Sequence, residues 1–169
     1  STVAELVNAA APAQAAVAAL SLDERLERIA AAAAALEANE RTVIDQAVRE
    51  TGQTLTFARR ELASALMLLR ALPDLADEIR PRTVPAVSGA TRLEWAPYGV
   101  VFGWHAANSP VWVPTVVAAS ALVAGNSVIC RPSRRTAGTT RVVLEALASA
   151  WPRHALQICA LPPDTGNPE

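Results

Sequence analysis

Two polar loops hold most of the side chains in this sequence that could bind a ligand or take part in a reaction. Residues 104–108 (WHAAN) follow one apolar run, and residues 131–135 (RPSRR) follow another. In the first loop, His105 could transfer a proton or be an ordinary polar loop residue. By its spacing, Asn108 suits the cap of a helix that begins near residue 111. The arginines of the second loop suit an anion such as phosphate, or form a solvated basic loop.

The two cysteines offer less chemistry than these loops. Cys130 and Cys159 each lie inside an apolar run, with no second cysteine close by in sequence. That spacing excludes a zinc knuckle or a redox pair and favours two buried thiols. The sequence also has no GxGxxG, P-loop, GxSxG or HExxH motif. We therefore expect no metal site.

The composition is that of a globular protein. Of 169 residues, 51% are hydrophobic and 18% are charged, with a net charge of −1; every basic residue is arginine. This balance argues against disorder and against nucleic-acid binding. No apolar run reaches the ~18 residues of a membrane span, and the alanine-rich start lacks the basic residues of a signal peptide. We expect a cytoplasmic protein.

Residues 1–80 read as a layer of helices. Residues 3–9 predict one short helix and residues 12–20 a second, with Pro12 at its first position. Ser21 and Glu24 form a capping box before a helix with apolar residues at helical spacing. A further helix ends at Gly52, and a long one, residues 54–71, should break or kink at Pro73.

The helical pattern of the first 80 residues does not continue into residues 81–97. Pro81 and Pro85 argue against a helix there. Thr91, Leu93 and Trp95 alternate with polar residues, which predicts a half-exposed strand with an exposed tryptophan.

Residues 98–169 predict three strands separated by two helices. The strands are residues 100–104, which should be buried on both faces, 127–130 and 156–161, and the helices are residues 111–124 and 139–151. Short βαβ connections imply parallel strands, so the fold class is α/β: a helical layer plus the first half of a doubly wound sheet. Ligands of such sheets bind beyond the carboxyl ends of the strands, where both polar loops lie.

Four motifs and their intervals resemble the aldehyde dehydrogenase superfamily. They are residues 97–101 (PYGVV), 108–110 (NSP), 121–126 (ALVAGN) and 131–133 (RPS), beside the family's P-x-G-V, N-x-P, A-L-x-x-G-N and K-P-S. Residues 50–52 (ETG) are similar to the family's E-x-G helix end. The likeness runs from about residue 11 to 161, and it is the spacing of the four motifs together that is specific.

The resemblance implies roles for individual residues. The family oxidises aldehydes with NAD or NADP through a cysteine thiohemiacetal, and Asn108 matches the amide that stabilises the developing oxyanion. Arg131, Pro132 and Ser133 match the loop that binds the adenosine ribose, and Arg134 replaces a glutamate common in NAD-preferring members, which favours NADP. Cofactor contacts are also expected from the first loop, at the positions Trp104, His105 and Ala106.

The sequence also departs from the family. Ala106 and Ala107 stand where Pro-Trp is common, and Arg131 replaces a lysine, which keeps the charge but changes the geometry. Acyl-thioester reductases related to the family vary in this first loop, so an acyl substrate stays open. The family's nucleophilic cysteine, its general-base glutamate and its glycine-bearing phosphate loop fall beyond Glu169, so this chain alone should be inactive.

Three interpretations follow. The chain is the front of an aldehyde-dehydrogenase-like enzyme, or a non-catalytic binding module that completes its sheet with a partner chain, or one half of a split enzyme. A binding module would cover its exposed sheet edge by dimerising or by capping another protein. In the family the region of residues 81–97 belongs to an oligomerisation arm, so the resemblance implies a homo-oligomer.

Overall fold

The structure is a computed structural model that describes residues 2–160. Its helices are α1 (Val3–Ala18), α2 (Leu22–Ala38), α3 (Glu40–Thr51), α4 (Leu55–Ala76), α5 (Trp112–Val123) and α6 (Ala137–Ala148), with single 3-10 turns at Asp77–Ile79 and Arg134–Thr136. Its strands are β1 (Arg82–Ala86), β2 (Gly89–Leu93), β3 (Val100–Trp104), β4 (Ser127–Arg131) and β5 (Leu156–Ile158). The α/β fold class predicted from the sequence is confirmed.

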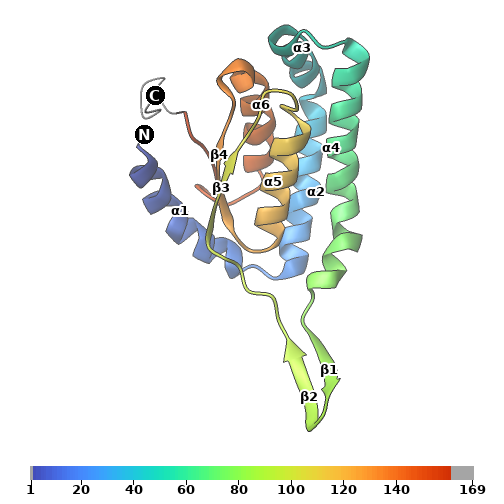
Figure 1. The fold of residues 1–169 in the computed structure, drawn as a ribbon, viewed down its shortest axis with the longest axis vertical. Coiled ribbons are helices and arrows are strands. Elements are labelled where there is room, and N and C mark those ends of the chain that lie inside the picture. The colour runs from blue at the N-terminus through green and yellow to red at the C-terminus, as the bar shows by residue number, and fades with distance from the viewer. Residues whose placement is uncertain (1, 161–169) are drawn as a thin grey trace.

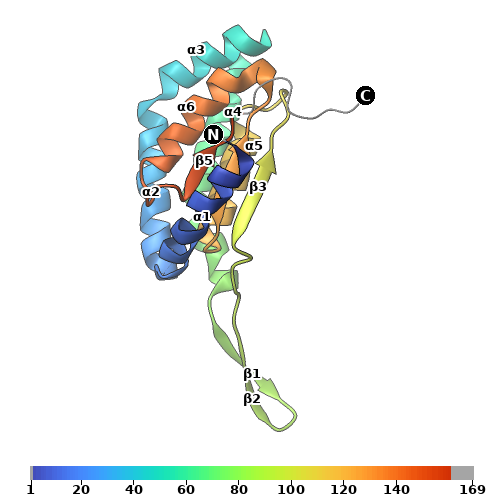
Figure 2. The same cartoon turned by 90° about the vertical axis from the view of Figure 1, so that its left-hand side faces the viewer.

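The core is a parallel sheet with helices on both faces. Its strands lie in the order β3-β4-β5, and α5 and α6 are the crossovers between them. Val128 and Cys130 of β4 pack into the main apolar core with α5 and α6, while Ile129 packs on the opposite face against α1. Helices α2, α3 and α4 form an outer layer behind α5 and α6 (Figures 1 and 2).

Strand β3 is less buried than its apolar sequence predicts. Of its five residues, Gly103 is buried, but Phe102 is 46% and Trp104 is 73% exposed. The prediction of a strand buried on both faces is therefore wrong. The physical reason is that β3 lies at the edge of the described sheet, and α1 packs over Val100 but leaves the outward face of Phe102 and Trp104 uncovered.

Two prolines lie inside helices rather than at their ends. Residues 3–20 were predicted as two helices, yet α1 runs unbroken through Pro12, and α4 continues past Pro73 to Ala76. Both prolines lie on exposed faces, while the apolar stripes on either side of them are buried. Packing of a continuous stripe outweighs the lost backbone hydrogen bond, as tertiary context often outweighs local propensity.

The segment between α4 and β3 is an antiparallel hairpin that projects from the body (Figures 1 and 2). The predicted strand at Thr91–Trp95 is shifted to Gly89–Leu93, and its partner Arg82–Ala86 contains Pro85, which suits a strand with a free edge. The hairpin is exposed almost throughout, rather than half-exposed, because no other described element packs on either face. Trp95 is exposed, as expected.

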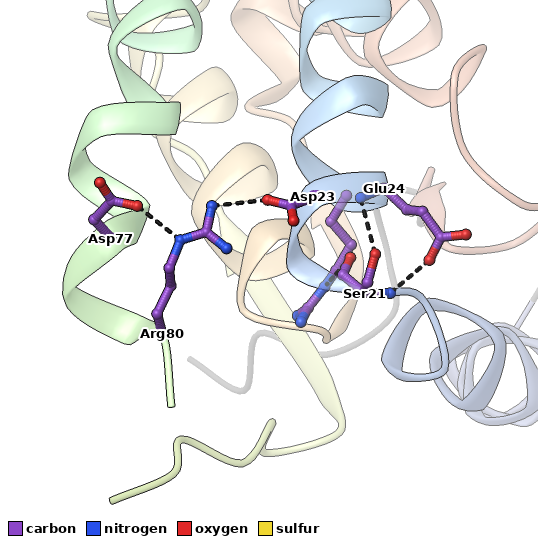
Figure 3. Close-up of polar contacts among 6 residues, drawn as sticks. Ser21, Asp23, Glu24, Asp77 and Arg80 are labelled. Atoms are coloured by element: carbon purple, nitrogen blue, oxygen red, sulfur yellow. Dashed lines mark hydrogen bonds and ion pairs between the residues drawn. The ribbon is translucent and has the colours of Figure 1, made fainter. Parts of the chain in front are cut away.

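The start of α2 lies at the base of this hairpin. The capping box is confirmed: Ser21 Oγ accepts from Glu24 N, and Glu24 Oε2 accepts from Ser21 N at 2.7 Å (Figure 3). Arg80, just before the hairpin, donates to Asp77 and to Asp23, each at 2.7 Å. These contacts tie the hairpin's first strand to both α2 and α4.

The last predicted strand is shorter in the structure. Strand β5 ends at Ile158, although Cys159 N still donates to Cys130 O at 2.8 Å. Leu161 and the predicted loop at residues 162–166 lie outside the described residues.

Among residues 2–160, no single helix is long and apolar enough to cross a membrane. Helices α1 and α2 have the length and apolar composition of a membrane span only when taken together, and the chain bends by 116° between them.

Candidate functional site

The two polar loops lie side by side at the carboxyl ends of β3 and β4. In the parallel register Trp104 is paired with Arg131, and the Arg131 guanidinium carbon lies 4.3 Å from the centroid of the Trp104 ring. One residue later, His105 N donates to Arg131 O at 3.0 Å. A cation–π contact and a backbone hydrogen bond therefore join the two loops.

Asn108 lies exposed in the turn before α5 and does not cap that helix. Glu61 of α4 does so instead: its Oε1 accepts from Val111 N at 3.0 Å, Trp112 N at 2.9 Å and Ser109 Oγ at 2.7 Å. The capping role that spacing suggested for Asn108 is wrong. Within residues 2–160 its side-chain amide has no hydrogen-bond partner, so it is available to a ligand.

His105 lies beneath the first loop rather than on its open side. Its side chain is 1% exposed, and neither ring nitrogen has a hydrogen-bond partner in the described part of the chain. The ring packs so close to β3 that a Cβ added at Gly103 would lie 3.1 Å from its Nε2. Burial lowers the pKa of His105, so the ring is neutral at pH 7. It serves as a packing residue of the loop and not as a solvent-facing polar group.

The second loop borders a cavity of about 300 Å³. The residues around it are Arg131, Pro132, Arg134, Ala137, Gly138, Arg141, Ile158, Cys159 and Ala160. Three of them are arginines, and none of the described lining residues is acidic, so the cavity suits an anionic ligand. Trp104, His105 and Ala106 do not line this cavity, and Ser133 accepts from Arg135 N at 3.3 Å beside it.

Arg141 also borders the cavity, although the sequence analysis did not predict it as a site residue; its position on the helix could have indicated this. It follows Ala137 by four residues on α6, so the two lie on one face of the helix and both reach the cavity. Its guanidinium also lies 3.4 Å from Glu145 in an exposed ion pair.

Glu50 closes the start of α6 much as Glu61 closes α5. Its carboxylate accepts from Gly138 N at 2.9 Å, Thr139 N at 2.8 Å and Thr139 Oγ1 at 2.6 Å. Burial alone would raise the pKa of Glu50, but hydrogen bonds from Thr139, Gln46 and Gly138 outweigh it and hold that pKa below its ordinary value. Neither capping role was predicted. The signal for Glu61 was a carboxylate placed inside the buried stripe of α4, between Ala58 and Leu62.

Both cysteines are buried and unpaired, as expected. Burial raises the pKa of the Cys130 thiol to about 12, so this group is not a nucleophile at neutral pH.

Sequence comparison matches this chain to one family of known proteins. The aldehyde dehydrogenase family model matches residues 1–167. The N-succinylglutamate 5-semialdehyde dehydrogenase of Burkholderia mallei (strain SAVP1) is 32% identical over 150 residues, which cover 88% of this chain and 31% of that protein. The protein of the same name from Burkholderia thailandensis is 31% identical over the same shares. The chain thus spans about a third of the length of these curated relatives.

Solved structures give the same result. An aldehyde dehydrogenase from Brucella melitensis biovar abortus 2308 superposes with a TM-score of 0.86 at 27% identity, over 92% of this chain and 33% of that one. An NADP-dependent glyceraldehyde-3-phosphate dehydrogenase from Bacillus halodurans C-125 shares the fold with a TM-score of 0.86 at 24% identity, over 93% and 35%. The resemblance seen in the four motifs is confirmed, and the chain belongs to the aldehyde dehydrogenase family.

Proposed function

We propose that the protein containing this chain is a nicotinamide-nucleotide-dependent oxidoreductase that oxidises an aldehyde, or reduces a related acyl thioester. One observation carries the proposal. In a chain of this family, the loop after β3 presents a free amide, Asn108, and the loop after the neighbouring strand β4 borders an arginine-lined cavity.

In this proposal Asn108 donates hydrogen bonds to the substrate oxygen as negative charge develops on it. A donor held in place before the reaction lowers the barrier by about 3–4 kcal/mol in comparable sites. Two observations support this role: Asn108 is exposed, and it is Glu61, not Asn108, that caps α5.

The cavity beside β4 fits the adenosine end of the nucleotide. Its three arginines are Arg131, Arg134 and Arg141, and guanidinium groups bind phosphate through paired hydrogen bonds. NADP carries one more phosphate than NAD, on the adenosine ribose, so this charge pattern favours NADP. When bound, the nicotinamide ring accepts or donates the hydride in this class of reaction; this chain's residues bind and orient the nucleotide.

The hairpin supports a further part of the proposal, association with a second copy of the protein. Its strands are exposed on both faces, and Val87, Leu93 and Trp95 present apolar side chains to solvent. An exposed strand edge with apolar side chains is suited to pairing with another chain.

The experiment is a steady-state assay of the intact protein that contains this chain, with NADP and with NAD, against a panel of aldehydes. Arg134→Glu should lower kcat/KM for NADP by about 10- to 100-fold and affect NAD less, since a charged hydrogen bond is worth about 1.5–3 kcal/mol. Arg135→Glu is the matched control, because Arg135 is exposed in the same loop but does not line the cavity. Absence of both turnover and nucleotide binding would contradict the proposal.

A further inference from the structure

Glu61 stands out because it is a carboxylate buried in an otherwise apolar stripe. It is 7% exposed, and its neighbours on that face of α4 are alanines and leucines. A single oxygen, Oε1, takes all three hydrogen bonds, from Ser109 Oγ, Val111 N and Trp112 N. Burying a carboxylate costs free energy unless hydrogen bonds compensate, and the second oxygen, Oε2, is buried with no partner within residues 2–160, so part of that cost remains.

Helix α5 has no cap of its own within the described chain. Its N-cap residue is Val111, whose side chain cannot accept a hydrogen bond, and its first backbone N–H groups would otherwise be unpaired. The carboxylate of Glu61 satisfies two of them and places negative charge at the positive end of the helix dipole. The start of α5 is therefore fixed by a residue 50 positions earlier in the chain.

Asn108 comes immediately before the residues that Glu61 holds. Ser109 is bonded to Glu61 on one side, and on the other side His105 N is bonded to Arg131 O. The five-residue stretch 105–109, which contains Asn108, is thus anchored at both ends, to β4 through His105 and to α4 through Ser109. The side chain of Asn108 remains free.

We propose that Glu61 is a positioning residue, which holds the turn at Ser109–Trp112 so that the Asn108 amide points at the reacting oxygen. The inference rests on the proposed function, because it assigns Glu61 a role in the reaction proposed for Asn108. Donors of this kind must be placed within about 0.5 Å, and a displacement of about 1 Å can lower the rate 100-fold. Because Glu61 is buried and its hydrogen bonds go to the turn, it acts through the turn and not by direct contact with the substrate.

The test uses the intact protein and a two-by-two set of variants: wild type, Glu61→Ala, Asn108→Ala and the double variant. We expect Glu61→Ala to lower kcat by about 10- to 100-fold, with KM for the aldehyde and Kd for the nucleotide within about twofold of wild type. In the Asn108→Ala background the same change should lower kcat no further, because the group it positions is gone. An equal loss in both backgrounds would overturn the proposal.

Two further variants separate positioning from general damage. Glu61→Gln keeps the shape and one accepting oxygen, so its kcat should lie clearly closer to that of wild type than the kcat of Glu61→Ala does. This variant also keeps the test valid if Glu61→Ala does not fold. Glu50→Ala removes the matching cap from α6, behind the nucleotide cavity. It should weaken nucleotide binding and lower kcat at saturating nucleotide less than Glu61→Ala does.

The outcomes also distinguish the two proposals. Turnover that is unchanged in Glu61→Ala would refute the positioning role while the proposed function stands. A wild-type protein with no turnover would refute the proposed function, and the role of Glu61 in catalysis with it.

Discussion

Thr139 donates two hydrogen bonds to one carboxylate oxygen of Glu50, a residue 89 positions earlier in the sequence. Glu50 Oε2 accepts from the Thr139 backbone N–H at 2.8 Å and from its hydroxyl at 2.6 Å. The pair joins the end of α3 to the start of α6. The helical layer thereby fixes one end of a crossover helix of the sheet.

Both crossover helices are held at both ends in this way. Arg25 of α2 donates to Val123 O at the end of α5 at 2.7 Å, and Arg28 donates to Ala150 O just after α6 at 2.8 Å. Carboxylates accept hydrogen bonds at the starts of both helices, and arginines donate hydrogen bonds at their ends. This arrangement complements the helix dipoles. Residues outside the βαβ unit therefore set the position of the loops that carry the candidate site.

Glu50→Ala should destabilise the intact protein by about 1–2 kcal/mol. The change leaves two backbone N–H groups at the start of α6 without their partner, and the loss of a cap typically costs this amount. Urea unfolding measures it. Glu37→Ala is the control: it breaks an exposed ion pair with Arg70, for which about 0.5 kcal/mol or less is expected. Equal losses in the two variants would contradict the assignment of Glu50 as a cap.

The contribution of Glu50 should depend on pH. Its pKa is lower in the folded state than in the unfolded chain, where about 4.3 is usual. The stabilisation is therefore fully present above the unfolded pKa and is lost as pH falls through the folded one. The difference in unfolding free energy between wild type and Glu50→Gln should be constant above about pH 5.5 and shrink below about pH 4. A difference that grew at acid pH would refute the sign. Glu24, whose pKa is also lowered, is present in both proteins and cancels.

Local signals in the sequence were the most reliable ones. The capping box of Ser21 and Glu24 was predictable because both partners lie within one helical turn. The adjacency of the two polar loops was also predictable, because the carboxyl ends of neighbouring parallel strands meet at one edge of a sheet.

The failures arose where a distant residue or packing decided the outcome. The spacing of Asn108 suited a helix cap, but the actual cap is Glu61 on another helix. Pro12 seemed to start a helix because the local rule is strong, yet the buried stripe of Leu6, Ala10 and Ala13 continues across it. The spacing of residues near Asn108 does not reveal Glu61, which lies 50 residues before Val111.

Gly125→Ala should destabilise the protein by about 1–3 kcal/mol. Gly125 has φ of +88°, which residues with a side chain rarely adopt, and an added Cβ would lie 2.7 Å from Arg25 Nη1. That contact would displace the guanidinium from Val123 O. A double-mutant cycle with Arg25→Ala separates the two effects, because backbone strain persists without Arg25 while the collision does not. Strictly additive losses in urea unfolding would show that the collision contributes nothing.

Cys130 should resist alkylation in the folded protein. With a pKa of about 12, only about one thiol in 10⁴ is ionised at pH 8, and the side chain is fully buried besides. Iodoacetamide labelling read by peptide mass spectrometry should find Cys130 unmodified in the native state and modified in denaturant. Rapid native labelling would contradict both the burial and the raised pKa.

His105 should make the folded state less stable at mildly acidic pH. Its ring is buried with both nitrogens unpartnered in the described structure, and burial lowers its pKa from the ordinary value. The unfolded chain therefore takes up a proton more readily than the folded one, so the stabilisation present above about pH 6.5 is lost as pH falls from there toward the lower folded pKa. His105→Leu keeps an apolar group against Gly103 and removes this titration. The variant should be more stable relative to wild type at pH 5.5 than at pH 7.5 in urea unfolding. His154→Asn, at the other of the chain's two histidines, controls for the loss of a histidine as such. If the stability of His105→Leu relative to wild type were the same at both pH values, His105 would not be a buried neutral group.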